Sequence, residues 1–356
     1  MNRMLISSSF VAAAAVVLSG CSAVGTKTTQ ADAPSRGAQT GSGEVVLVTH
    51  NSFHLPEELI ADWEKESGYT LTVNAAGDGG TLASKLSLSA GDPAGDVAFG
   101  VDNTFASRPL DAGVFAEFIP AQGESNEKYG LVDGGDRLTP VDVANVCLNV
   151  DTAWFAERGI DEPTSLADLT KPTYEDLTVV PGASTSTPGM AFLLATIAEY
   201  GDDWPEYWAD LIDNGLRVVD GWEDAYYGDF TAGSKKGARP IVLSYDSSPA
   251  FTVKDGATTT RALLQTCFQQ VEYAGVLAGA ANPSGAESFV TWLVSPEVQA
   301  ALPESMYVFP VDESVELPSD WATFAQRAEE PYDLDPADIS AQREEWLTQW
   351  TDVVTR

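Results

Sequence analysis

Short apolar runs alternate with amphipathic stretches along most of the chain, which predicts alternating strands and helices. Residues 44–49, 70–74 and 96–100 are rich in β-branched and aromatic residues, the composition of buried strands. Helical spacing of apolar positions follows in residues 56–68 and 79–90. This order predicts a mostly parallel sheet covered by helices, with ligands beyond the carboxyl ends of its strands. The loops to inspect are therefore 50–54, 76–80 and 101–103.

Two longer apolar runs, 138–150 and 265–277, exceed the typical strand length. A second α/β segment lies between them, and a predicted helix over 283–302 follows them. We therefore expect an α/β fold of two lobes joined by a two-strand hinge, with a cleft that closes on a ligand. The expected parts are lobe 1 (44–142 plus 276–315), lobe 2 (143–275) and a C-terminal helical segment (316–356).

The N-terminus has the features of an export signal rather than of a folded segment. Residues 1–20 combine Arg3 with an apolar run that is too short to span a membrane, as in a signal peptide. The run ends in LSGC, which resembles a bacterial lipobox with Cys21 as the lipid-modified residue. The alternative is an ordinary secretory signal with a chance cysteine. Residues 21–43 have the composition of a flexible tether, so we expect a lipid-anchored protein on the extracytoplasmic face of the cell membrane.

Charge and histidine content exclude several classes of function. The chain has 19 lysines and arginines against 53 aspartates and glutamates, a net charge of −34. Nucleic acid is therefore not expected as a partner, because binding to phosphates needs clustered basic side chains. The 2 histidines, His50 and His54, follow a strand rather than lie on a helix, so no metal site is predicted. The acidity fits a cationic ligand, but it is also what solubility alone requires.

The two cysteines of the body, Cys147 and Cys267, lie one in each long run. Paired cysteines are common in exported proteins, so we expect a disulfide between them. This pairing requires the two runs to be neighbours in space. The alternative is two separate buried thiols.

Four local patterns could form a ligand site. The segment 184–189 (STSTPG) places hydroxyl groups and free N–H groups at a helix start, which suits an anion or is an ordinary helix cap. A second hydroxyl-rich loop, 244–249 (SYDSSP), follows a predicted strand. Trp222 stands beside two acidic residues, a pattern that suits a flat cation or simple packing. Asp78 lies between glycines, where it either shapes a turn or accepts a hydrogen bond from a ligand.

From about residue 45 to residue 356 the chain resembles the thiamine-binding subunit of bacterial ABC transporters. The resemblance rests on 9 collinear segments: THNSF, DGGTLASKL, VAFGVDN, TSTPG, GWEDAYYG, LSYDSSPA, QVEYAGVLAGA, WLVSPEVQAALPESMYVFPV and AQREEWLTQW. It implies a two-lobed class II periplasmic binding protein that has no cofactor and no catalytic activity. Its partners would be thiamine or thiamine phosphates and an ABC permease.

The resemblance also implies the ligand contacts. In the family, Asp78 and Gly79 would contact the aminopyrimidine, and Ser186 and Thr187 would face the hydroxyethyl or phosphate tail. The pocket would be completed by Trp222, Tyr245, Asp246, Ser247 and Ser248. The chain has His50 and Phe251 where the family can have tyrosine, and both still offer a flat face. Asp246 stands where a relative has a neutral hydroxyl, which would favour thiamine without phosphate.

Two other functions stay open at this point. The adjacent pair Tyr226 and Tyr227 is of the kind that holds iron in ferric-ion-binding proteins of the same fold group. A thiaminase-like enzyme shares the general fold and uses a cysteine nucleophile. The positions of Cys147 and Cys267 within long strands argue against that enzyme.

Overall fold

The computed structural model of the chain describes residues 41–121 and 124–356. The expected signal peptide, Cys21 and most of the expected tether lie outside these residues. Within the described ranges, no helix is both long and apolar enough to cross a bilayer.

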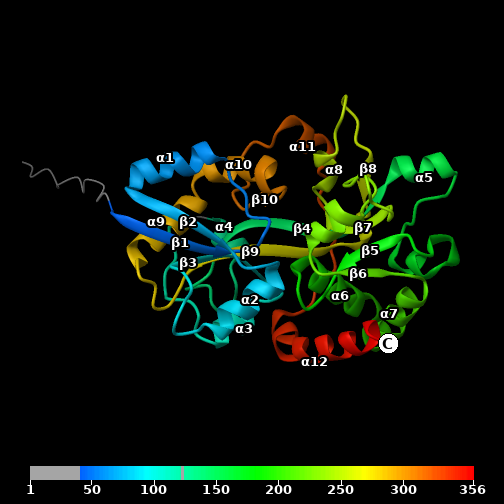
Figure 1. Cartoon of the computed structure of the whole chain (residues 1–356), viewed down its shortest axis with the longest axis horizontal. Coiled ribbons are helices and arrows are strands. Elements are labelled where there is room, and N and C mark those ends of the chain that lie inside the picture. Colours follow the sequence, from blue (N-terminus) through cyan, green and yellow to red (C-terminus); the bar gives the residue numbers. More distant parts are fainter. Residues whose placement is uncertain (1–40, 122–123) are drawn as a thin grey trace, which may run out of the picture. The chain divides into compact units, whose positions relative to one another are not determined.

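The strands of the described residues form one sheet of 10 strands (Figure 1). Three are parallel neighbours on one side: β2 (Tyr69–Ala75), β1 (Gly43–Thr49) and β3 (Val97–Asp102). Three more are parallel on the other side: β7 (Ile241–Tyr245), β5 (Thr178–Pro181) and β6 (Arg217–Val219). The long strands β9 (Phe268–Val276) and β4 (Thr139–Asp151) run antiparallel between the two groups, with β8 (Thr260–Ala262) and β10 (Phe309–Pro310) on β4. The predicted strands of the first segment and the first predicted long strand are confirmed, whereas 265–277 contains the shorter strand β9.

Helices cover both faces of this sheet (Figure 1). In the first part of the chain they are α1 (Glu57–Ser67), α2 (Gly79–Leu88), α3 (Ser107–Asp111), α4 (Glu124–Tyr129), α5 (Thr152–Arg158), α6 (Thr187–Tyr200) and α7 (Trp204–Asp213). The others are α8 (Ser248–Phe251), α9 (Pro283–Leu293), α10 (Pro296–Met306), α11 (Ser319–Phe324) and α12 (Pro336–Val354).

The helix predicted over 283–302 is wrong in one respect, because it is two helices. Ser295 has extended backbone angles (φ −73°, ψ 153°) and separates α9 from α10. The residue before a proline avoids the helical region, and Pro296 fits the first turn of the new helix. Tyr307 then ends α10 with φ 59°, in the left-handed region. The short strand β10 begins two residues later.

The disulfide expected between the two long runs is present. Cys147 in β4 and Cys267, the residue directly before β9, are bonded, with their Cα atoms 4.2 Å apart. The antiparallel register explains the pairing, since Val146 lies opposite Phe268 and the next pair is therefore the two cysteines. The bond ties together the two strands that join the parallel groups.

The C-terminal helix α12 contacts two helices that lie far apart in the sequence, α7 and α3. Its Trp350 ring meets the buried Trp208 of α7 edge to face, at 5.7 Å between ring centroids. Its Arg343 is buried and donates hydrogen bonds to the Thr104 carbonyl (3.2 Å) and the Ser107 hydroxyl (2.9 Å) beside α3. The C-terminal helical segment predicted over 316–356 contains α11 and α12, and α12 connects α7 with α3.

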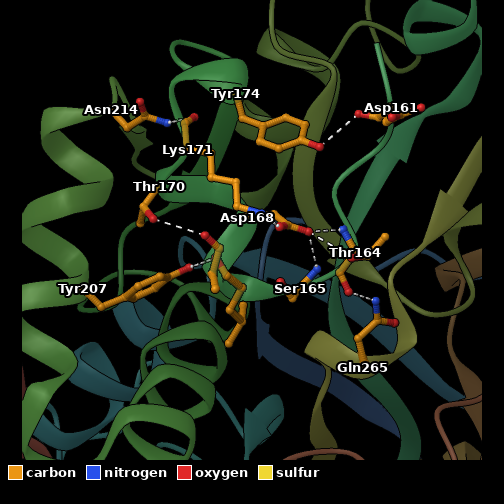
Figure 2. A network of polar contacts seen from close by, with 12 residues as sticks. Asp161, Thr164, Ser165, Asp168, Thr170, Lys171, Tyr174, Tyr207, Asn214 and Gln265 are labelled. Carbon is orange, nitrogen blue, oxygen red and sulfur yellow. Dashed lines mark hydrogen bonds and ion pairs between the residues drawn. The ribbon is translucent and has the colours of Figure 1, made fainter.

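A polar network fixes the turns that precede β5 (Figure 2). The Asp168 carboxylate accepts hydrogen bonds from the Thr164 N–H (2.7 Å) and the Ser165 N–H (3.2 Å), forming a capping box. Its other oxygen lies 2.5 Å from Lys171 Nζ. The Lys171 ammonium and the N–H donors hold the pKa of Asp168 at about 2, although partial burial acts against them.

Asp168→Ala should destabilise the protein by about 1–2 kcal/mol at pH 7, the usual cost of a lost helix cap. The folded state lowers the pKa of Asp168 from its ordinary 3.8, so its contribution is present above that value and is lost as the pH falls toward 2. Urea unfolding at several pH values measures the free energy of unfolding of the variant and the wild type. The difference between the two proteins should become smaller below about pH 4. Asp161→Ala is the matched control, because Asp161 is exposed and enters this network through its carbonyl. An equal loss in both variants would contradict the capping role.

Candidate functional site

The loops beyond the carboxyl ends of the parallel strands surround a cavity of about 360 Å³. Residues 50–54 follow β1, Asp78 and Gly79 follow β2, and Trp222 and Glu223 follow β6. Two of the loops that the rule for open α/β sheets singled out, 50–54 and 76–80, thus contribute to this cavity, whereas residues 101–103 do not line it. The lining consists of His50, Asn51, Ser52, Phe53, His54, Asp78, Gly79, Thr187, Trp222, Glu223, Tyr227, Tyr245, Glu272, Ser305, Met306, Tyr307 and Val308.

Asp78 connects the loops from the two parts of the sheet across this cavity. One carboxylate oxygen accepts the Gly79 N–H at 2.6 Å and caps α2. The other accepts the backbone N–H of Trp222 at 2.8 Å. Asp78 thus shapes the turn and lies at the cavity wall, and its hydrogen bond to a ligand stays a prediction.

The starts of α2 and α6 are in direct contact beside Asp78. The Thr81 N–H donates to the Thr185 carbonyl at 3.0 Å. A Cβ atom on Gly79 would lie 2.1 Å from Thr187 Oγ1, so only glycine allows this approach. Thr187 lines the cavity, and its buried hydroxyl interacts with the Asp102 carboxylate, whose pKa it lowers.

Trp222 presents a fixed aromatic face to the cavity. Its ring stacks on Tyr226 with 5.2 Å between centroids and 24° between planes. Its Nε1–H donates to Ser244 Oγ at 3.0 Å, and that hydroxyl lies 2.7 Å from Ser248 Oγ. Ser248 therefore supports the wall from behind and does not line the cavity.

Four other residues expected at the ligand also lie outside the lining. The Asp246 carboxylate is buried against Asn145, accepting its N–H at 3.2 Å and its Nδ2–H at 2.7 Å. Ser247 Oγ donates to the Tyr307 carbonyl at 2.5 Å. The Ser186 hydroxyl is buried at the start of α6, and Phe251 packs on Tyr307 with 4.1 Å between ring centroids. The expectation that Asp246 repels a ligand phosphate therefore does not fit its position.

The lining carries three carboxylates, Asp78, Glu223 and Glu272, and contains no lysine or arginine. Five lining residues were not singled out by the sequence analysis: Glu272, Ser305, Met306, Tyr307 and Val308. Glu272 is an acidic residue inside an apolar strand, and this was the available signal. Tyr307 is a non-glycine residue with positive φ, which no sequence pattern announced.

His50 occupies a tight position above β3. A Cβ on Gly100, whose φ is +93°, would lie 2.1 Å from His50 Cδ2, so glycine makes room for the ring. Burial lowers the pKa of His50, but the nearby charges of Glu272, Asp78 and Glu223 outweigh it and raise the pKa above its ordinary value. The acidic setting thus stabilises the protonated imidazole relative to that of a free histidine.

The tyrosine pair is divided between two environments. Tyr227 lines the cavity, whereas Tyr226 is buried beneath Trp222. Burial raises the pKa of Tyr226 and, to about 12, that of Tyr227. Among the described residues no group of three or more His, Cys, Asp or Glu is placed to hold a metal ion. Cys147 and Cys267 are bonded to each other, so neither offers the thiolate that a thiaminase-like mechanism uses.

Comparison with known proteins agrees with this picture. The family model described as bacterial extracellular solute-binding protein matches residues 92–326. The thiamine-binding periplasmic protein of Escherichia coli strain K12 is 29% identical over 325 residues, covering 88% of this chain and 94% of that protein. A solved periplasmic thiamin binding protein superposes with a TM-score of 0.77 at 27% identity, covering 88% and 96% of the two chains. Iron-bound HitA from Pseudomonas aeruginosa has a TM-score of 0.67 at 18% identity, covering 87% and 99%, a likeness of fold alone. The expected two-lobed α/β fold is confirmed.

Proposed function

Because this chain belongs to the bacterial extracellular solute-binding protein family, we propose that it captures thiamine and delivers it to an ABC permease. The similarity to thiamine-binding periplasmic proteins covers nearly the whole of their length, which supports this substrate. The relatives are binding proteins, and the chain is proposed to act as a carrier rather than an enzyme.

The observation that carries the proposal is the composition of the cavity wall. Thiamine has a positively charged thiazolium ring, a flat aminopyrimidine and a hydroxyethyl tail. The wall offers three carboxylates to the cation and the aromatic faces of Trp222 and Tyr245 to the rings. In this arrangement Trp222 borders the thiazolium, and Asp78 and Gly79 contact the aminopyrimidine.

The same wall favours thiamine over its phosphates. A phosphate tail would meet Asp78, Glu223 and Glu272 without any lysine or arginine in the lining. The Thr187 hydroxyl in the lining suits the uncharged hydroxyethyl tail, to which it can donate or from which it can accept. The preference for thiamine without phosphate therefore rests on Asp78, Glu223 and Glu272 rather than on Asp246.

The site of action follows from the N-terminal sequence. We place the protein on the extracytoplasmic face of the cell membrane, with Cys21 as the lipid anchor and residues 22–43 as the tether. Export fits the disulfide between Cys147 and Cys267, since such bonds persist in oxidising compartments. Mass spectrometry of the mature N-terminus in the native host tests this part, and an unmodified Cys21 would contradict it.

Calorimetric titration is expected to show 1:1 binding of thiamine, with thiamine diphosphate at least about tenfold weaker because of charge repulsion at the acidic wall. Thiamine recovered after incubation should be intact. Absence of heat with thiamine, together with a purple tyrosinate colour on adding Fe(III), would favour the ferric alternative. Cleaved thiamine would favour an enzyme.

A further inference from the structure

Three acidic residues lie side by side across the middle of the sheet. Glu272 of β9 is opposite Asp102 of β3 on one side and opposite Asp142 of β4 on the other. All three are buried, with 0%, 1% and 7% of Asp102, Asp142 and Glu272 exposed. The Asp102 carboxylate is occupied by the Thr104 and Phe105 N–H groups, at 3.0 and 2.9 Å. Among the described residues, Asp142 Oδ2 has no hydrogen-bond donor.

Asp142 and Glu272 form a carboxyl pair, because they lie opposite each other in the register of β4 and β9. Burial, and next the charge and hydrogen bonding of Glu272, raise the pKa of Asp142 well above its ordinary value. A raised pKa favours the protonated carboxyl of Asp142, which can donate a hydrogen bond to the Glu272 carboxylate. Glu272 is the member of the pair that lines the cavity.

His50 faces the Glu272 carboxylate from the loop after β1. Its Nε2 lies 3.6 Å from Glu272 Oε1 and has no hydrogen-bond partner within the described residues. The other ionisable groups around the pair are Asp102, whose pKa burial raises to about 6, and Asp78 and Glu223, which line the cavity. Tyr245 is also close, and burial and Glu272 raise its pKa well above its ordinary value. The lining contains no lysine or arginine, and of its two histidines, His50 and His54, His50 is the one that contacts Glu272 within the described residues.

We infer that Glu272 is the counter-ion that selects a cationic ligand, and that protonated His50 takes the place of the ligand's charge in the empty site. Capture of the cation then expels the proton of His50 to solvent. Asp142 is a positioning residue, because its proton holds the Glu272 carboxylate and does not touch the ligand. This inference rests on the proposed function, since it names how the same cavity recognises a cation.

The sign of the linkage follows directly. A bound cation beside Glu272 opposes a second positive charge on His50, so the pKa of His50 falls on binding. Affinity then rises with pH while His50 titrates, by at most about tenfold per pH unit for one released proton. At pH values above or below the range in which His50 titrates, its protonation does not change the affinity for the ligand.

The test is calorimetry with thiamine near pH 6.5 in buffers of different ionisation enthalpy, which counts the protons released per ligand. The wild type should release a measurable fraction of a proton, and His50→Gln should release less by that amount while still binding. The difference between the two proteins removes any titration of thiamine itself. Binding by the wild type with the same proton count as His50→Gln would overturn the inference and leave the proposed function intact. Absence of binding would instead contradict the proposed function.

Two further variants separate recognition from mere structural support. Glu272→Gln should bind thiamine at least about tenfold more weakly and should lose the proton release, because neither the ligand nor His50 then meets the charge. Asp142→Asn keeps a donor at the same position, so it should retain both the affinity and the proton release. Equal binding by Glu272→Gln and the wild type, with native circular dichroism, would overturn the role of Glu272. Loss of proton release in Asp142→Asn, with native circular dichroism, would overturn the positioning role of Asp142.

Discussion

Replacing Cys147 and Cys267 together by alanine is expected to lower the free energy of unfolding by about 4–5 kcal/mol. The disulfide joins residues 120 positions apart, so it closes a long loop and removes much of the conformational freedom of the unfolded chain. It also joins β4 to β9, on which both parallel groups of the sheet depend. Urea unfolding with and without a reductant measures the effect.

The alanine variant provides its own control for this measurement. A reductant should destabilise the wild type once the bond is reduced and should leave the double variant unchanged. Thiol labelling of the denatured, unreduced wild type should find neither Cys147 nor Cys267 free, in line with the bond in the structure. A double variant as stable as the wild type would mean that the sheet holds the two strands in place without the bond.

The sequence predicted most elements because local signals and the final structure agree in them. Pro56 precedes α1, and Gly68 ends it with φ 81°, the left-handed conformation that glycine adopts easily. The helix over 283–302 was predicted as one because its apolar spacing continues across Pro296. Proline is compatible both with an interrupted helix and with the first turn of a new one, and the extended backbone of Ser295 decides for the second.

The candidate site was predictable in its loops and less so in its side chains. Strand order placed His50, Asp78 and Trp222 at one edge of the sheet, and all three line the cavity. Asp246 directly follows Tyr245, yet its carboxylate turns to Asn145 in β4 rather than into the cavity. Such a direction depends on a neighbouring strand, which the local sequence does not contain.

Glu272 is a second residue whose position the local sequence could not predict, although its side chain does line the cavity. An isolated acidic residue in an apolar strand indicates a functional or paired group, but its partners come from other segments. Asp142 lies 130 positions earlier in the chain, and the antiparallel register of β4 and β9 brings the two together. Register over this distance follows from the folded sheet, so the carboxyl pair could be found only in the structure.

Asp78→Asn is expected to weaken thiamine binding by about 10- to 100-fold. Its carboxylate accepts the Trp222 N–H at 2.8 Å and the Gly79 N–H at 2.6 Å, and hydrogen bonds to a charged group contribute about 1.5–3 kcal/mol. An asparagine has one acceptor oxygen, and its amide group would face one of these two N–H groups without accepting a hydrogen bond. The change also removes one negative charge from the cavity wall, which weakens the attraction for the cation.

Calorimetric titration of Asp78→Asn beside two controls distinguishes these contributions. Ser186→Ala should change the affinity little, because the Ser186 hydroxyl is buried outside the lining and has no partner within the described residues. Asp224→Asn removes a charge from the same loop as Trp222 at an exposed position outside the lining, so it reports the effect of net charge alone. If Asp224→Asn weakened binding as much as Asp78→Asn, the acidic field would account for the loss without the bridge to Trp222. If Asp78→Asn bound thiamine like the wild type, the bridge would be a contact of the protein with itself, and recognition would depend on Glu272 and the aromatic faces.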